Sequence, residues 1–351
     1  MGIFTQAFFL QNTYFNKPSK LEDMSGQINF GVIGAGRIGA FHARNIKQYT
    51  DAKIYAVADV VKEVADTLAR EVGAEKTYYS PEDLIRDERV DAIVICLPNN
   101  LHYQVSMMAI EAGKHVFCEK PLCLKSSEAE DLVRRVRKAG VKFQVGYNRR
   151  FDKSYENARK LIEEGRLGKL VLAYSNTFDP EPHSGWEANE KLSGGILFTT
   201  CSHDFDMLYW LIGSRVRRVY TESRGAFGRD QYLMSLLSFE NDVLGVVSVF
   251  EVCPYGHDVK TEIIGDTASV RIEMPAATYL RKFDKNGVHM DYPYWFLDRF
   301  GHSYIREIQD FVRCIKEDKE PRVTVEDGAH IVKICEAAKE SLLKKAPIDV
   351  R

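Results

Sequence analysis

Two side chains that lie far apart in the sequence could together remove a proton from a hydroxyl group. Lys120 follows the apolar run 115–118, within Glu119-Lys120-Pro121, where its charge would stabilise a developing alkoxide. His203 follows Gly194-Gly195 and opens an apolar helix, and imidazole titrates near neutrality, as a general base should. A surface lysine after a strand and a histidine that caps a helix are the alternatives. The pattern predicts a catalytic pair, provided that the fold brings both residues together.

A glycine-rich segment near the N-terminus predicts a dinucleotide site. Gly34-Ala35-Gly36-Arg37-Ile38-Gly39 directly follows the apolar run 29–33 and opens a helix. The first glycine allows a tight turn, the second lets the backbone approach a pyrophosphate, and the third lets helix and strand pack closely. The pyrophosphate then meets free N–H groups at the positive end of the helix. The expected cofactor contacts are Gly34, Gly36, Arg37, Ile38 and Gly39.

The end of the next strand indicates which dinucleotide is bound. Asp59 closes the run Val57-Ala58-Asp59, where a carboxylate should meet the hydroxyls of the adenosine ribose. Because that carboxylate repels a 2′-phosphate, NAD is favoured over NADP, although Lys62 lies nearby. The alternative is an aspartate that caps the following helix, and the two roles can coexist.

Two further strand ends are expected to face the nicotinamide half of the same crevice. Ligands of such sheets bind outside the carboxyl ends of the strands. The apolar run 92–97 leads into Pro98-Asn99-Asn100-Leu101-His102, and the run 115–118 leads into Glu119-Lys120-Pro121. The expected contacts here are Pro98, Asn99, His102, Glu119 and Lys120.

The alternation of short apolar runs and helices explains how these residues could be positioned. Between residues 28 and 147 the runs are apolar on both faces, which is typical of a parallel sheet covered by helices. After residue 148, strands joined by short turns indicate antiparallel pairing. The sequence therefore predicts an α/β protein with an N-terminal Rossmann doubly wound parallel sheet over 27–149. A C-terminal α+β domain with a large open, mainly antiparallel sheet follows over 150–351, and its last helix is expected to pack toward the Rossmann domain.

Composition argues against several classes of function. The 351 residues carry a formal net charge of -2, which gives no general attraction to nucleic acid, and no run approaches the length of a membrane span. Seven cysteines without a C-x-x-C pair predict no metal site and fit a cytoplasmic, reducing compartment. Residues 1–26 precede the first strand. We expect them to form either an extension that packs on this chain or on a neighbouring subunit, or a disordered tail.

The chain resembles the Gfo/Idh/MocA family of oxidoreductases from about residue 28 to residue 348. The most specific matches are the segments 34–39 and 98–102, the triplet Glu119-Lys120-Pro121, the Gly-Gly and His-Asp-Phe-Asp stretch of 194–206, and Val325-Glu326-Asp327-Gly328. The resemblance implies that Lys120 is the catalytic lysine, before a cis proline bond, and that His203 is the general acid/base. It also implies a C-terminal sheet that forms contacts within a homo-oligomer, either a dimer or a tetramer.

The resemblance further predicts which residues contact the substrate, and one of them departs from the pattern. The candidates are Arg149, Arg150, Asn176, Thr199, His257 and Tyr304. Thr199 stands four residues before His203, where inositol-type members have an aspartate. A threonine hydroxyl forms hydrogen bonds but does not accept a proton at neutral pH. An aspartate–histidine pair is therefore absent at this place in the chain.

These observations lead to one functional hypothesis and two alternatives. The hypothesis is an NAD-dependent oxidoreductase that takes a hydride from a secondary hydroxyl of a sugar, sugar derivative or cyclitol, while Lys120 orients that hydroxyl and His203 removes its proton. The first alternative keeps NAD bound and recycles it while acting on glycosides through a 3-keto intermediate. For such a ligand, polar and aromatic side chains are available at Asp179, His183, Trp186 and Glu187. The second alternative is a non-catalytic NAD-binding regulator.

Overall fold

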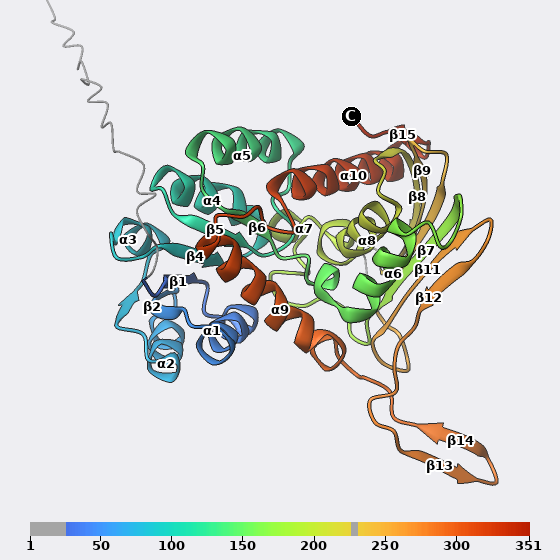
Figure 1. The fold of residues 1–351 in the computed structure, drawn as a ribbon, viewed down its shortest axis with the longest axis horizontal. Coiled ribbons are helices and arrows are strands. Elements are labelled where there is room, and N and C mark those ends of the chain that lie inside the picture. The colour runs from blue at the N-terminus through green and yellow to red at the C-terminus, as the bar shows by residue number, and fades with distance from the viewer. Residues whose placement is uncertain (1–25, 226–230) are drawn as a thin grey trace, which may run out of the picture.

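The structure is a computed structural model that describes residues 26–225 and 231–351. Apart from Gly26, the proposed N-terminal extension lies outside the described residues. The rest folds around two sheets, a parallel one toward the N-terminus and a mostly antiparallel one toward the C-terminus (Figure 1). The predicted fold class is confirmed.

The N-terminal sheet has six parallel strands in the order β3-β2-β1-β4-β5-β6. The strands are β1 (Asn29–Ile33), β2 (Lys53–Ala58), β3 (Lys76–Tyr78), β4 (Ala92–Ile95), β5 (His115–Cys118) and β6 (Phe143–Val145). The helices are α1 (Arg37–Tyr49), α2 (Lys62–Val72), α3 (Pro81–Arg86), α4 (His102–Glu111) and α5 (Ser126–Ala139). Because helices cover both faces, every residue of β4 is buried, as its unbroken apolar sequence predicts. The sequence interpretation missed β3, whose three residues are short of a recognisable pattern and are not fully buried.

The second sheet has seven strands in the order β12-β11-β7-β10-β9-β8-β15. The strands are β7 (Leu170–Phe178), β8 (Val216–Arg224), β9 (Tyr232–Phe239), β10 (Leu244–Phe250), β11 (Asp258–Gly265), β12 (Ser269–Ile272) and β15 (Ile348–Asp349). All neighbours are antiparallel except β7 and β10, which run parallel. Helices cover one face of this sheet, so residues alternate between buried and more exposed along β9 and β10.

Further helical segments carry some of the predicted site residues, namely Asn99, Arg149, Arg150, Thr199 and His203. They are η1 (Asn99–Leu101), η2 (Asn148–Phe151), α6 (Lys153–Glu163), α7 (Glu190–Ser193), η3 (Leu197–Cys201) and α8 (Ser202–Ile212). A π-helical turn, η3, leads directly into α8. Such turns often occur at functional sites, and this one precedes His203.

The last two helices tie the two halves of the molecule together. They are α9 (Phe296–Lys316) and α10 (Val325–Lys344). Helix α9 packs on α1, and its Phe311 ring contacts Phe30 and Phe117 in the N-terminal sheet. Helix α10 contacts α5 as well as β8, as expected for a last helix that packs toward the Rossmann domain (Figure 1).

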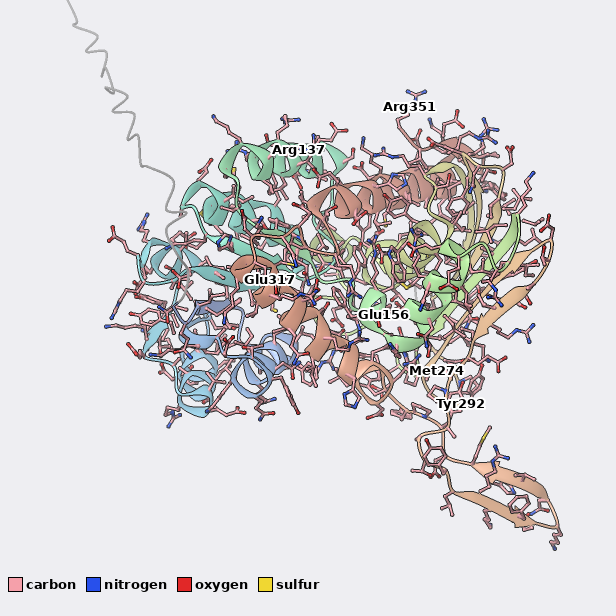
Figure 2. All side chains as sticks on the ribbon, in the orientation of Figure 1. Arg137, Glu156, Met274, Tyr292, Glu317 and Arg351 are labelled. Carbon is pink, nitrogen blue, oxygen red and sulfur yellow. The ribbon has the colours of Figure 1, made fainter. Side chains whose placement is uncertain are left out.

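Two features of the C-terminal half differ from the sequence interpretation. Helix α9 begins at Phe296 and not at Tyr304, because the Asp298 carboxylate accepts a hydrogen bond from the Trp295 N–H and caps the helix early. The hairpin of β13 (Arg281–Asp284) and β14 (Gly287–Met290) was not predicted. It projects away from the body of the molecule, beyond Tyr292 in Figure 2.

Candidate active site

The glycine-rich turn has the shape that a pyrophosphate requires. Gly34 has a φ of +92°, and a Cβ there would lie 2.2 Å from the Cys96 carbonyl oxygen. A Cβ on Gly39 would lie 1.8 Å from the Gly34 carbonyl oxygen, so helix and strand can approach this closely only without a side chain. Gly36 is the N-cap of α1, has no side-chain cap, and faces open space. This open backbone at a helix N-terminus fits the pyrophosphate of a dinucleotide.

Asp59 holds this turn in place. Its Oδ2 accepts a hydrogen bond from the Ala35 N–H at 2.8 Å, and its Oδ1 accepts one from the Val61 N–H at 2.9 Å. The carboxylate therefore stabilises the segment before α2 while remaining partly exposed beside the glycine turn. Its negative charge at this place fits the ribose hydroxyls of NAD and disfavours a 2′-phosphate.

Two residues that were expected to contact the cofactor also support the loops around it. Asn99 is buried, and its Nδ2 donates to the Ser193 carbonyl oxygen at 2.7 Å. His102 is buried, and its ring nitrogens lie 2.7 Å from the Pro121 and 2.9 Å from the Leu97 carbonyl oxygen. Both residues position the loops that follow β4 and β5, and their contacts with the cofactor stay a prediction.

Lys120 and His203, which come from the two halves of the chain, line one cavity of about 130 Å³. Arg37 and Ile38 of the glycine-rich segment line the same cavity, which places it next to the dinucleotide site. Other predicted residues on its wall are Glu119, Thr199, His257 and Tyr304. The fold thus unites residues from as far apart in the sequence as Arg37 and Tyr304.

The Lys120 ammonium group is directed toward helix η3. Its Nζ donates to the Thr199 carbonyl oxygen at 2.8 Å, which leaves two further N–H donors for a ligand. Burial lowers the pKa of Lys120, although the charges of Glu119 and Glu187 partly oppose that effect. A substrate hydroxyl in the cavity would meet a partly desolvated cation, which is suited to stabilise negative charge on oxygen.

His203 lies at the start of α8 and is partly buried in the cavity wall. Its Nδ1 has no hydrogen-bond partner among the described residues. Burial, together with the positive charges of Lys120 and Arg149, keeps the pKa of His203 well below its ordinary value of 6.5. The ring is therefore neutral at neutral pH and can accept a proton, but nothing at Nδ1 stabilises the charged form.

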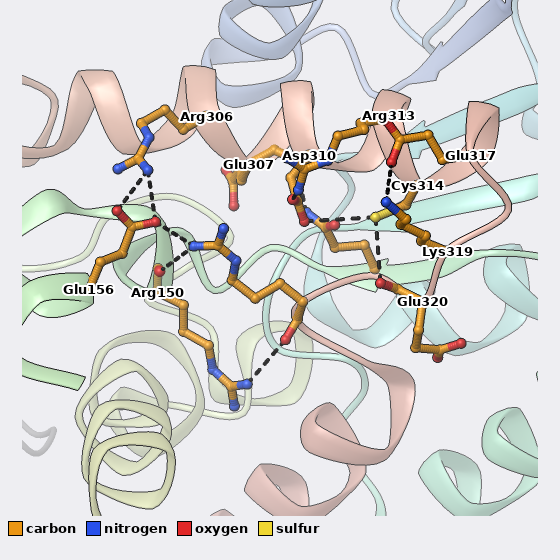
Figure 3. Close-up of polar contacts among 12 residues, drawn as sticks. Arg150, Glu156, Arg306, Glu307, Asp310, Arg313, Cys314, Glu317, Lys319 and Glu320 are labelled. Carbon is orange, nitrogen blue, oxygen red and sulfur yellow. Dashed lines mark hydrogen bonds and ion pairs between the residues drawn. The ribbon is translucent and has the colours of Figure 1, made fainter. Parts of the chain in front are cut away.

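Of the adjacent arginines, Arg149 faces the cavity and Arg150 does not. Arg149 donates to the Asp204 carboxylate at 3.3 Å and to the Thr177 hydroxyl at 2.8 Å. Arg150 is buried, and forms ion pairs with Asp206 at 2.6 Å and Asp327 at 2.9 Å. Figure 3 shows Arg150 among other charged side chains, which include Glu156 and Arg306. The prediction that Arg150 binds substrate is therefore wrong, because both ends of its guanidinium are used within the protein.

Replacing Arg150 by leucine should unfold the protein more readily without changing ligand affinity. The substitution leaves the Asp206 carboxylate buried without its cation, and such a loss costs about 3–5 kcal/mol. Urea unfolding measures this change, and a titration with NAD checks that cofactor affinity is kept. The double variant Arg150→Leu/Asp206→Leu should be less destabilised than the single one. Equal stability of wild type and Arg150→Leu would contradict the structural role.

Asn176 is the second candidate substrate residue that the structure contradicts. It lies on β7, and its Nδ2 donates to the Asp258 carbonyl oxygen at 3.4 Å on the far face of the sheet. Its neighbour Thr177 is buried on the helix-covered face and lines the cavity. Because successive side chains of a strand point to opposite faces, an error of one position in the alignment moves the residue out of the site.

Two carboxylate–imidazole pairs in the cavity wall were not predicted. His257 Nδ1 lies 2.7 Å from Asp179 Oδ1, and His183 Nδ1 lies 2.6 Å from Glu251 Oε1. The first pair forms because β7 and β11 are antiparallel neighbours, with Phe178 opposite Asp258 at their ends. Asp179 and His183 were singled out in the sequence as ligand contacts, but no sequence signal showed which partner each would have.

Two buried acidic residues lie near Lys120: Glu119, which the sequence indicated, and Glu307, which it did not. Glu119 Oε1 accepts a hydrogen bond from His42 Nε2 at 2.7 Å, and its Oε2 accepts one from the Lys120 backbone N–H at 3.1 Å. Glu307 of α9 is fully buried, and neither of its oxygens has a partner among the described residues. Burial and the nearby charge of Glu119 raise the pKa of Glu307 well above its usual value.

Comparison with known proteins agrees with this geometry. Residues 28–147 match the model of the Gfo/Idh/MocA oxidoreductase family, NAD-binding Rossmann fold, and residues 159–350 match its C-terminal alpha/beta domain. The chain belongs to this family. It therefore binds NAD in its Rossmann domain and is an oxidoreductase. Among the described residues, no helix is long and apolar enough to cross a membrane.

Several relatives within the family carry an activity in their names. The chain is 33% identical over 329 residues to a myo-inositol 2-dehydrogenase from Thermotoga maritima, covering 92% of this chain and 98% of the relative. It is 31% identical to an NAD(+) scyllo-inositol 2-dehydrogenase from Bacillus subtilis, covering 93% and 97%. The crystal structure of a scyllo-inositol dehydrogenase from Lactobacillus casei with bound NAD(H) and scyllo-inositol superimposes with a TM-score of 0.87, at 29% identity, covering 93% of this chain and 99% of that one.

One detail implied by the family resemblance is confirmed, and the structure shows the contacts of Thr199, which stands where inositol-type members have an aspartate. The Lys120-Pro121 peptide bond is cis. Thr199 lines the cavity, and its hydroxyl donates to the Gly195 carbonyl oxygen at 3.0 Å. The position therefore carries no proton acceptor of its own.

Proposed function

We propose that this family member oxidises a secondary hydroxyl of a cyclitol or related sugar, with NAD as the hydride acceptor. The observation that carries the proposal is the single cavity lined by both Lys120 and His203, beside the glycine-rich turn. The cavity is small, and most of the residues that line it carry polar or charged side chains, which suits a compact polyol. The named activities of the relatives support the same class of substrate.

When it is bound, NAD supplies the hydride acceptor, and the protein supplies position and charge. Lys120 donates a hydrogen bond to the reacting hydroxyl and stabilises the negative charge that develops on its oxygen. His203 accepts the proton of that hydroxyl. His257 and Tyr304, on the same wall, are proposed to hold the other hydroxyls. Holding the reactants in this geometry lowers the entropic part of the barrier.

A dehydrogenase assay tests the proposal. The purified protein is incubated with NAD and with myo-inositol, scyllo-inositol or simple sugars, and NADH formation is followed by its absorbance. We expect turnover with at least one cyclitol or sugar and a marked preference for NAD over NADP. NAD binding without turnover of any polyol would favour the non-catalytic regulator.

The lowered pKa of Lys120 should appear in the pH dependence of oxidation. The ammonium group is charged below its pKa and loses its charge as the pH rises through it. Because that pKa lies below the ordinary 10.5, kcat/KM should begin to fall at a pH below 10.5. In Lys120→Arg, any remaining activity should lack this fall, since a guanidinium stays charged. A wild-type profile that keeps rising beyond pH 10.5 would rule out Lys120 as the required cation.

A second cavity gives some support to glycosides as substrates with recycled NAD. It has a volume of about 360 Å³ and shares His183 and Glu187 with the reaction cavity. A polyol in the first cavity could therefore extend a second ring into its neighbour. NADH absorbance in the purified protein without added cofactor, together with conversion of a glycoside to a 3-keto product, would support this version.

We also propose a cytoplasmic location, because the seven cysteines are free and suit a reducing compartment.

We further propose that the chain forms a homo-oligomer through the uncovered face of its seven-stranded sheet. Large apolar side chains are exposed on this face of β7, β9 and β10, at Tyr174, Tyr232, Met234, Leu236 and Leu244. Such a face is typical of a subunit interface. Leu236→Glu should reduce the particle mass measured by light scattering, whereas the control Leu343→Glu on α10 should not. A monomeric wild type would contradict the proposal.

A further inference from the structure

The active-site histidine has no carboxylate of its own to share its proton. Thr199, one helical turn before His203, has a hydroxyl that is already engaged with the Gly195 carbonyl oxygen. The buried Nδ1 of His203 has no partner among the described residues. His203 can therefore accept a proton from a hydroxyl but lacks the group that would stabilise or carry that proton further.

An imidazole that is paired with a carboxylate, His183 with Glu251, lies next to Thr199. His183 Nδ1 is 2.6 Å from Glu251 Oε1 and 3.4 Å from the Thr199 hydroxyl oxygen. The Glu251 side chain is 2% exposed, whereas the His183 side chain is 20% exposed and lines the reaction cavity. Because the Glu251 carboxylate lies at ion-pair distance from Nδ1, we expect the ring to carry its hydrogen on Nδ1 and to accept a proton at Nε2.

The charges around the two histidines differ in sign. Carboxylates from three elements face His183, namely Glu251 after β10, Glu187 in its own loop and Asp179 after β7. Burial opposes a charge on His183, but the hydrogen bond and charge of Glu251 outweigh it and raise the pKa of His183 above 6.5.

The groups that act on His203 are cationic instead. The two cations are Lys120 and Arg149, which line the same cavity as His203. Burial is the largest cause that lowers the pKa of His203 well below 6.5, and these two charges, with His257 just before β11, act in the same direction. A proton in this cavity is consequently more stable on His183 than on His203.

We propose that the His183–Glu251 pair is the proton acceptor behind His203 and replaces the carboxylate that position 199 lacks. The inference rests on the proposed function. As the O–H bond of the substrate breaks, its proton binds His203, and the hydride leaves with its electron pair for NAD. The proton then passes to His183 Nε2 across a water or substrate hydroxyl in the cavity that both rings line. Glu251, 2.6 Å from His183 Nδ1, stabilises the imidazolium that forms.

The pH profile and kcat of Glu251→Gln test this inference. In the wild type, oxidation should lose activity as the pH falls through a value above 6.5, because His183 must be neutral to accept the proton. Glu251→Gln should move this loss to lower pH and reduce kcat by about 10²-fold, while NAD affinity stays unchanged. His183→Gln, on a partly exposed loop, should reduce kcat by a similar factor. The control Glu240→Gln, in an exposed turn, should match the wild type.

Rescue distinguishes proton transfer from a structural effect. In the Glu251→Gln background, Thr199→Asp places a carboxylate one turn before His203 and should restore most of the lost kcat. Histidine NMR should independently show one imidazole that titrates above pH 6.5 in the wild type and lower in Glu251→Gln. An active wild type whose profile is unchanged in Glu251→Gln, or a loss that Thr199→Asp does not restore, would overturn the inference. A wild type that oxidises no polyol would instead overturn the proposed function.

Discussion

Lys120→Met should reduce kcat by about 10²–10³-fold while leaving NAD affinity close to that of the wild type. Methionine has a similar length but cannot donate hydrogen bonds or carry charge, so the reacting oxygen loses its cation. The expected pyrophosphate site is backbone at Gly34 and Gly36, which does not involve the Lys120 side chain. Steady-state kinetics with the best polyol measures kcat, and a fluorescence titration measures NAD affinity.

A matched control separates this effect from the general loss of a lysine. Lys138→Met changes an exposed lysine at the end of α5 and should leave both kcat and NAD affinity unchanged. If Lys120→Met turned over as fast as the wild type, Lys120 would not contact the reacting hydroxyl, and the proposed mechanism would fail.

His203→Gln should reduce kcat by about 10²–10⁴-fold, which is the usual contribution of a general base. Glutamine keeps hydrogen-bonding capacity in the cavity wall but cannot take up a proton at neutral pH. Because His203 is not part of the glycine-rich turn, NAD affinity should be retained. The loss should be in kcat and not in KM alone, since the group acts during proton transfer.

His289→Gln is the control for this substitution, because His289 lies exposed on β14 and does not line the cavity. It should behave like the wild type. An increase in KM at unchanged kcat for His203→Gln would assign His203 to substrate binding instead of proton transfer.

The sequence predicted the fold well because its strongest patterns are local. Buried runs such as Ala92–Ile95 and the turn at Gly34 each follow from neighbouring residues alone. The exceptions were also local in origin. Strand β3 is too short for a periodic signal, and the early start of α9 depends on one capping carboxylate, Asp298.

A site residue could be predicted from the sequence only where a suitable side chain also points into the cavity. Lys120 and His203 have side chains that suit proton chemistry, and the structure brings them to one cavity. Arg150 and Asn176 have equally suitable side chains, but their directions depend on buried partners and on strand register. The pairing of His183 with Glu251 depends on a loop meeting the end of β10, and no sequence spacing encodes that contact.

A crystal structure of the protein with NAD and the best cyclitol or sugar would test the central claim most directly. We predict that one hydroxyl oxygen lies within about 2.6–3.2 Å of both the Lys120 Nζ and a ring nitrogen of His203. The carbon that bears this hydroxyl should face the nicotinamide. A bound polyol whose reacting hydroxyl touches neither side chain would contradict the account.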